Sequence, residues 1–368
     1  MIKGNQTAEG ASAHSDRIAP RGASVGGWNA SLFGSAMPGL EDPEPTTPFD
    51  IVDEGGLLRL RHYRPSAGPA PSRSVLLVSS LFKRPYILDL LPERSVVRSF
   101  LSQGFSVYLT DWVPPGPDDA WRGLDVYVNG DLARAVQYVR TREGIDQVSL
   151  VGCCLGGLLA LVYAALYPQT VQHLVPFASP IRKRPPLAPA AVDAVLRTYG
   201  NVPAWWIHAG LNMRVPTPFY LPGYFAQDFG EPELAKLGWN SPSPVLRALQ
   251  QWLDSDVPFA GRLFREMMCD VYWDGQLADG RLSVGGRNVA LKDICCPVLN
   301  ISAERDRLAP PPTAVSLTEY LGSRDVTNLV FPTGHLGLMV SLAAQKELWP
   351  LVGEWLSGGR TVQRYQAR

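Results

Sequence analysis

The sequence feature that most constrains the fold is the stretch VSLVGCCLGG at residues 148–157. An apolar, β-rich run leads into Gly-x-Cys-x-Gly-Gly, and an apolar run with helical spacing follows it. This pattern predicts a strand, a sharp turn and a helix, the layout of a nucleophile elbow, in which glycines let the backbone fold tightly around a reactive side chain. Cys154 occupies the nucleophile position. Taken alone, the pattern suits a buried cysteine beside a tightly packed helix equally well, so the rest of the chain has to decide.

The rest of the chain largely alternates strand and helix patterns, which is typical of a mostly parallel sheet. Residues 57–64 alternate apolar and polar side chains and predict a half-exposed antiparallel edge strand. Buried strands are predicted at 75–81, 105–112, from 148, and at 171–178, 297–303 and 326–331. Helices are predicted at 92–103, 124–142, 156–167, 312–320 and 343–356, with further helical stretches at 245–253 and 261–272. Reactive groups of such open α/β sheets lie beyond the carboxyl ends of the strands.

Composition divides the chain into three parts. Residues 1–48 are rich in Gly, Ser, Ala and Pro and predict a flexible N-terminal extension, with docking on a partner as the alternative. Residues 49–181 and 291–368 carry the strand and helix alternation and form the predicted α/β-hydrolase core. The aromatic-rich residues 182–290 interrupt it and predict a helical cap, inserted after the strand that follows the elbow and lying over the active site.

Charge and cysteine usage exclude several classes. The 34 Lys and Arg residues balance 34 Asp and Glu, so nothing favours nucleic acid or an anionic membrane as the main partner. The chain has no apolar run of about 18 residues and no evident signal peptide. Four of the five cysteines form the adjacent pairs 153–154 and 295–296, unlike a disulfide framework or a C-x-x-C metal site. We therefore expect a cytoplasmic protein without a metal site or a transmembrane segment.

Three residues after predicted strands point to catalysis. Cys154, Asp306 and His335 occur in the order nucleophile, acid, histidine that belongs to α/β hydrolases. A single Asp at a strand end is usually a helix cap, and a single His in a loop is usually structural, but the three in this order predict a triad. His335 would take the thiol proton, and Asp306 would orient and stabilise the imidazolium.

A cysteine nucleophile favours acyl transfer from thioesters over ester hydrolysis. An acyl group moves from a thioester to cysteine at nearly constant free energy, and the acyl-cysteine can still drive formation of an oxygen ester. Such a site must exclude water, which an aromatic cap would do. The predicted oxyanion hole consists of the backbone N–H of Leu155 and one from the loop after the first buried strand, near Leu81 or Phe82.

Several motifs resemble the polyhydroxyalkanoate synthases over about 49–356, and the short chain is most similar to the class III catalytic subunit. These motifs are RPYILDL at 84–90, DW at 111–112, YVNG at 127–130, the elbow, the stretch 284–308 with CPVLN at 296–300, and GHLG at 334–337. The resemblance implies that Cys154 is the acylated nucleophile, His335 its base and Asp306 the third member of the triad.

The resemblance further implies (R)-3-hydroxyacyl-CoA substrates, release of CoA and growth of a polyester chain. No cofactor is implied beyond the CoA thioester, which is a substrate. The implied partners are a second, non-catalytic synthase subunit, a second copy in a homodimer and the surface of a polyester granule.

The chain departs from the family at a few positions. Lys83 stands where an asparagine is expected before Pro-Tyr, Gly275 where Tyr-x-x-Asn-x-Leu has asparagine, and Leu155 where class III elbows carry glutamine. These departures favour, as the alternative, a related acyltransferase or cyclase that esterifies a CoA- or carrier-bound intermediate. A vestigial granule-surface scaffold and a plain esterase are further alternatives, but the complete triad argues against the first and the cysteine against the second.

Overall fold

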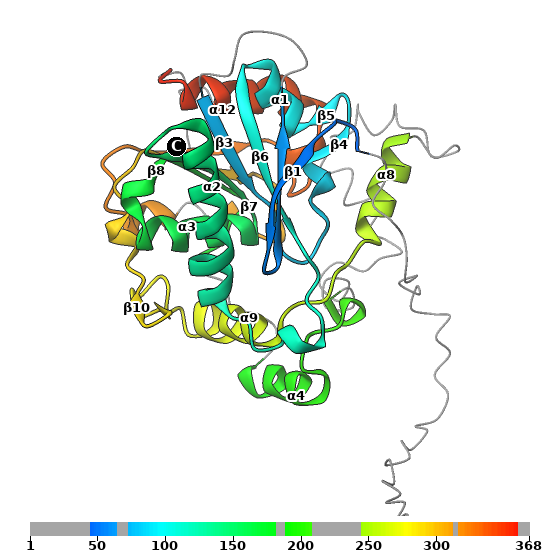
Figure 1. The fold of residues 1–368 in the computed structure, drawn as a ribbon, viewed down its shortest axis with the longest axis vertical. Helices are drawn as coiled ribbons and strands as arrows, with labels where there is room; N and C mark the ends of the chain where they lie inside the picture. Colours follow the sequence, from blue (N-terminus) through cyan, green and yellow to red (C-terminus); the bar gives the residue numbers. More distant parts are fainter. Residues whose placement is uncertain (1–44, 65–72, 182–187, 208–243, 312–315, 360–368) are drawn as a thin grey trace, which may run out of the picture. The chain divides into compact units, whose positions relative to one another are not determined.

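An eight-stranded sheet with the order β1-β2-β6-β3-β7-β8-β11-β12 forms the centre of the structure, which is a computed structural model (Figure 1). Strand β2 is antiparallel to both neighbours, and all other pairs are parallel. The strands are β1 (Asp50–Gly55), β2 (Leu58–Tyr63), β3 (Arg73–Val78), β6 (Phe105–Trp112), β7 (Val148–Cys153), β8 (Val171–Phe177), β11 (Val298–Ala303) and β12 (Val326–Phe331). The structure describes residues 45–64, 73–181, 188–207, 244–311 and 316–359, with the side chain of Ser316 left out.

Helices cover both faces of the sheet, and each face has its own apolar core. One core packs the π-helix η4 (Asp125–Leu132), α2 (Ala133–Glu143) and α3 (Leu155–Leu166) against the sheet. The other packs α1 (Val96–Ser102), α8 (Pro244–Leu253), α11 (Gly337–Val340) and α12 (Trp349–Leu356) against it. Neighbouring residues of β7 alternate between the two, with Leu150 in the first core and Val151 in the second.

The predicted buried strands are all present. Every residue of β6 and β7 is buried, as expected for central parallel strands that are covered on both faces. Two short hairpins pair β4 (Asp89–Leu91) with β5 (Arg94–Ser95) and β9 (Ser283–Val284) with β10 (Arg287–Asn288). The prediction of an α/β-hydrolase core is therefore confirmed at the level of the sheet.

The predicted edge strand is wrong in its position. The alternating residues 57–64 form β2, which lies between β1 and β6, and β1 is the edge strand. Arg59 of β2 is exposed, but two other polar side chains of this strand are buried because they have partners: Arg61 pairs with Asp111, and His62 hydrogen-bonds with Ser106. The alternation of apolar and polar residues at 57–64 therefore did not indicate that one face of this strand is exposed to solvent.

Several predicted helices contain π-helical turns. The helix predicted at 124–142 begins as η4 before α2, and the stretch at 261–272 forms α9 (Gly261–Arg265) followed by the π-helix η7 (Glu266–Trp273). The C-terminal helix begins as the π-helix η10 (Ala344–Leu348) before α12. Hydrophobic spacing alone does not separate these turns from an α-helix.

The predicted extension and cap fall partly outside the described residues. Residues 1–44 of the extension lie outside them, whereas Thr47 is buried and bonds Asp89 through both its N–H and its hydroxyl. Residues 182–187 and 208–243 of the predicted cap also lie outside them, as do 312–315 of the helix predicted at 312–320. The described parts of 182–290 include α4 (Pro189–Tyr199), α8, α9 and η7.

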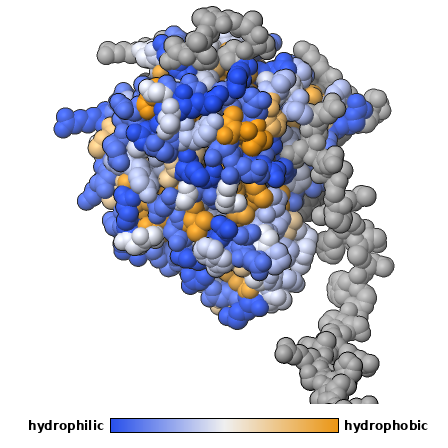
Figure 2. Space-filling view, in the orientation of Figure 1, coloured by the Kyte–Doolittle hydropathy of each residue, from blue (hydrophilic) through white to orange (hydrophobic). Residues whose placement is uncertain are grey.

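The surface is mixed. On the face that Figure 2 shows, apolar side chains form small patches between hydrophilic ones. Within the described ranges, no helix is long and apolar enough to cross a membrane.

Candidate active site

Cys154 lies at the turn between β7 and α3, at the carboxyl end of a central strand. Its backbone has φ 51° and ψ −116°. Residues other than glycine rarely adopt a positive φ because the Cβ atom clashes with the backbone, so this conformation persists only where the surrounding structure enforces it. The Cys154 N–H donates to the Phe177 carbonyl at the end of β8 over 2.9 Å. The predicted elbow is therefore present.

The glycines around Cys154 are required by close approach. A Cβ on Gly156 would lie 2.2 Å from the Val78 carbonyl oxygen, and one on Gly157 would lie 1.9 Å from Ser179 Oγ. A Cβ on Gly152 would lie 2.4 Å from the Gly157 Cα. The start of α3 thus packs directly on the end of β3, which no larger residue would allow.

His335 and Asp306 form a buried pair. Asp306 follows β11 and His335 follows β12, and His335 Nδ1 lies 2.7 Å from Asp306 Oδ2. The other oxygen, Asp306 Oδ1, accepts the N–H groups of Leu308 and Ala309 at 2.8 and 2.7 Å. Cys154 lies close enough to His335 to contribute to the rise in the pKa of that imidazole. The structure therefore brings the three predicted triad residues together.

The electrostatics of the pair make the His335 imidazole a strong proton acceptor beside an ionised carboxylate. Burial alone would lower the pKa of His335, but the Asp306 carboxylate, reinforced by Cys154, raises that pKa well above its ordinary value. Burial opposes ionisation of Asp306, yet His335 and the two backbone N–H groups lower the pKa of that carboxyl. The raised pKa of His335 suits this imidazole to accept a proton from a neighbouring group.

Cys153, the neighbour of the candidate nucleophile, lies in a different environment. It belongs to the core on the α12 side of the sheet, and its sulfur lies 3.4 Å from that of Met339. Burial raises the pKa of Cys153 well above that of a free thiol, and the nearby Cys154 and Asp306 add to this rise. Cys153 therefore stays a protonated, buried thiol, and Cys154 is the candidate nucleophile.

The loop after β3 is fixed next to the start of α3. The Ser79 N–H donates to Thr110 Oγ1 over 2.9 Å, Ser79 Oγ donates to the Thr110 carbonyl over 2.7 Å, and Trp112 Nε1 donates to the Ser79 carbonyl over 3.0 Å. A Cβ on Gly156 would lie 2.4 Å from that same carbonyl oxygen.

The predicted oxyanion donors lie in these two adjoining segments. Leu155 is in the first turn of α3, where N–H groups have no acceptor within the helix. Leu81 and Phe82 follow the fixed Ser79. The segments are thus adjacent, and the choice of N–H groups remains a prediction.

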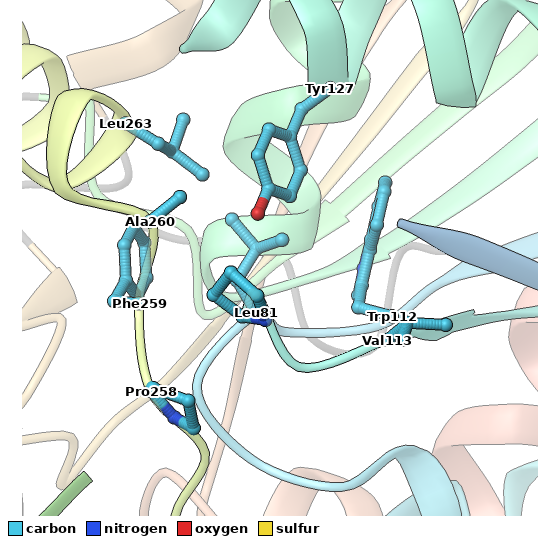
Figure 3. A pocket seen from close by; sticks show the side chains of 9 residues that line it. Leu81, Trp112, Val113, Tyr127, Pro258, Phe259, Ala260 and Leu263 are labelled. Carbon is cyan, nitrogen blue, oxygen red and sulfur yellow. The ribbon is translucent and has the colours of Figure 1, made fainter. Parts of the chain in front are cut away.

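A narrow pocket lies between this loop, the end of β6 and the insertion (Figure 3). It is lined by Leu81, Trp112, Val113, Pro115, Tyr127, Pro258, Phe259, Ala260 and Leu263. The Tyr127 ring points toward Leu81, and the residues from 258 to 263 lie opposite Trp112. The space open to water is ≈ 10 Å³, room for about one water molecule. Residues of the insertion thus close over the loop that carries the predicted oxyanion donors.

Comparisons with known proteins agree with this geometry. The sequence matches the alpha/beta hydrolase fold family over residues 75–342. It is 35% identical to the poly(3-hydroxyalkanoate) polymerase subunit PhaC of Allochromatium vinosum over 83% of this chain and 87% of that protein. It is 33% identical to the subunit PhaC of Thiocystis violacea over 84% and 88% of the two chains. The chain belongs to the poly(3-hydroxyalkanoate) polymerase family.

The fold of this polymerase family member also occurs in solved structures. A monoacylglycerol lipase from Paleococcus ferrophilus is similar with a TM-score of 0.53 at 18% identity, over 82% of this chain and 98% of the lipase. This likeness concerns the fold alone. The predictions of the family, the fold class and a polymerase-type acyltransferase are confirmed by these comparisons, whereas the cap is not.

Lys83, a departure from the family pattern, joins the loop of the polymerase to its insertion. Its Nζ lies 2.7 Å from Asp256 Oδ1, and both side chains are buried, with 5% and 4% exposed. The Lys83 ammonium also donates to the Leu253 carbonyl and lies 5.5 Å from the Trp252 ring centroid. The sequence marked Lys83 as unusual but gave no partner for it.

Two tyrosines near the polymerase site were not singled out from the sequence. Tyr127 lines the pocket, and burial together with the charge of Cys154 raises the pKa of Tyr272 far above its usual value. Both lie in stretches that resemble the family, YVNG at 127–130 and the Tyr-x-x-Asn-x-Leu position, so the motifs were the available signal. Within the described ranges, no group of three His, Cys, Asp or Glu side chains could hold a metal ion.

Proposed function

We propose that this chain polymerises (R)-3-hydroxyacyl groups from CoA thioesters through an acyl-cysteine at Cys154. The observation that carries the proposal is a cysteine at a strained elbow, near a buried and hydrogen-bonded histidine and carboxylate pair, in a member of the poly(3-hydroxyalkanoate) polymerase family. A cysteine accepts an acyl group from a thioester without loss of driving force, and a serine would not.

Acylation begins when His335 accepts the Cys154 proton and the thiolate attacks the thioester carbonyl. The N–H of Leu155 and one from the loop at 81–82 hold the oxyanion. The C–S bond to CoA then breaks, and CoA leaves as a thiol with the proton that His335 returns. Asp306 keeps the imidazole oriented and stabilises its charged form.

Elongation uses the same groups. The hydroxyl of a second hydroxyacyl unit attacks the acyl-cysteine carbonyl while His335 accepts its proton. An ester bond forms, the acyl C–S bond breaks and Cys154 recovers the proton. Water competes with that hydroxyl, so we propose that residues 182–290 form a cap that keeps the site dry. The apolar contacts of residues 258–263 with the loop support this role.

The same reading extends to cofactors and partners. The chain would need no cofactor beyond the CoA thioester substrate and would act in the cytoplasm. We propose a second synthase subunit, a homodimer and a polyester granule surface as its partners. The relatives from Allochromatium vinosum and Thiocystis violacea are each named as a polymerase subunit, which supports a second subunit.

Mass spectrometry of the protein after brief exposure to 3-hydroxybutyryl-CoA tests the assignment. We expect an acyl group on Cys154, release of CoA and an insoluble polyester. Cys154→Ala should abolish all three, whereas the matched control Cys153→Ala should retain them because the Cys153 thiol is buried against Met339. Activity of Cys154→Ala would refute the proposal. Soluble monomeric esters with CoA release would favour the related acyltransferase or cyclase instead.

A further inference from the structure

The Tyr272 hydroxyl is a buried polar group that the mechanism above does not use. Tyr272 lies on η7 with 6% of its surface exposed. Its hydroxyl is buried and has no hydrogen-bond partner within the part of the chain that the structure describes. A buried hydroxyl without a partner costs free energy, so native proteins rarely keep one without a role.

Tyr272 lies close to the candidate nucleophile. Tyr272 belongs to the apolar cluster that includes Leu81 and Leu155, and Cys154 packs against this cluster. Burial, together with the nearby Cys154, raises the pKa of the Tyr272 phenol. Tyr272 therefore stays protonated at any working pH and can donate a hydrogen bond but cannot act as a base. Its position on a π-helical segment fits a site, since such turns are frequent where function requires a local distortion.

The acyl group on Cys154 offers few atoms that could satisfy this hydroxyl. In the proposed reaction, the thioester carbonyl oxygen is held by backbone N–H groups, including that of Leu155. The remaining polar atom of a 3-hydroxyacyl group is its hydroxyl, two carbons beyond the carbonyl. We propose that Tyr272 hydrogen-bonds the 3-hydroxyl of the acyl group on Cys154 and so selects hydroxyacyl over unsubstituted acyl thioesters. This inference rests on the proposed function.

The physical basis is the difference between a satisfied and an orphaned phenol. A hydroxyacyl group would complete the hydrogen bond, whereas an unsubstituted acyl group would leave the Tyr272 hydroxyl buried against apolar atoms. Sites built to bond a substrate hydroxyl reject analogues that lack it for this reason.

The test compares acylation of Cys154 by 3-hydroxybutyryl-CoA and by butyryl-CoA in wild-type protein and in Tyr272→Phe. Wild type should prefer the hydroxyacyl substrate, and the variant should lose about 10- to 100-fold with it, the range for one hydrogen bond in a dry site. With butyryl-CoA the variant should keep its rate. The unfolding midpoint of Tyr272→Phe should not fall, because the hydroxyl has no described partner to lose.

The matched control is Tyr163→Phe, whose hydroxyl lies 3.0 Å from Thr170 Oγ1. It should lower the unfolding midpoint and leave the ratio of the two acylation rates unchanged. Equal losses of Tyr272→Phe with both substrates, or no loss with either, would overturn the inference and leave the proposed function standing. A wild-type ratio near one would also overturn it. Failure of wild type to accept either acyl group would refute the proposed function and the inference with it.

Discussion

Replacing Lys83 by methionine should strongly destabilise the protein by orphaning Asp256. Both side chains are almost fully buried and their charged atoms lie 2.7 Å apart, so the change leaves a carboxylate in an apolar site. Breaking one side of a buried ion pair costs about 3–5 kcal/mol. We therefore expect Lys83→Met to lose about 3–5 kcal/mol at pH 7.

The expected stability of the double variant follows from the balance between the desolvation of the two charges and their mutual attraction. Burial lowers the pKa of Lys83 more than Asp256 raises it. The desolvation of the buried ammonium therefore offsets its attraction to the carboxylate. Replacing both residues, Lys83→Met with Asp256→Val, should therefore restore stability to near or above wild type, since apolar residues often replace a buried pair without loss. The two residues face each other in a β-bridge, a backbone setting that suits valine.

The assay is denaturant unfolding of wild type, both single variants and the double variant at pH 7. Acylation of Cys154 should fall in the single variants. The Phe82 carbonyl, next to Lys83, accepts the Val257 N–H over 3.3 Å, so loss of the ion pair should also disturb the loop that carries a predicted oxyanion donor. A loss under about 1 kcal/mol, or additive single and double variants, would refute the reasoning.

Two further predictions concern the site itself. Because the pKa of His335 is raised in the folded state, this group stabilises the fold below about pH 6.5, and the stabilisation is lost as the pH rises through the folded-state pKa. Because the pKa of Asp306 is lowered, this group stabilises the fold above about pH 4, and the stabilisation is lost as the pH falls through the folded-state pKa. Asp306→Asn should therefore cost about 2 kcal/mol, most between pH 4 and 6.5, in denaturant unfolding followed across pH; a loss independent of pH would contradict the pairing. Gly156→Ala should abolish acylation of Cys154 because its Cβ would lie 2.2 Å from the Val78 carbonyl oxygen, while Gly130→Ala, with its nearest contact at 4.0 Å, should leave the rate unchanged. Equal rates in the two glycine variants would rule out the close approach as the cause.

The sheet could be predicted because its strands carry a strong local signal. Phe105–Trp112 was predicted with the bounds that the structure shows, since a continuous apolar run between turn residues has few other solutions. The position of β2 could not be predicted, because Arg61 and His62 are buried by partners on β6 that only the folded sheet brings near. The π-helical turns also carry no sequence period of their own.

At the site, chain order was enough to find the three triad residues. Cys154, Asp306 and His335 each follow a strand end, and the parallel sheet carries those ends to one edge. The links between segments could not be predicted, because Lys83 and Asp256 are 173 positions apart and nothing local marks them as a pair. Tyr272 was missed for a related reason: an unpartnered hydroxyl is visible only after every neighbour is placed.

The placement of Cys153 has a consequence for oxidative damage. A cysteine sulfenic acid is rescued when a nearby thiol condenses with it to a disulfide, and without that step it proceeds to the irreversible sulfinic acid. Cys153 is adjacent in sequence, but it remains a protonated thiol that is fully buried against Met339. It is therefore unsuited to resolve an oxidised Cys154, and we expect peroxide to inactivate the enzyme permanently unless a small thiol from solution, or an acyl group already on the sulfur, protects it.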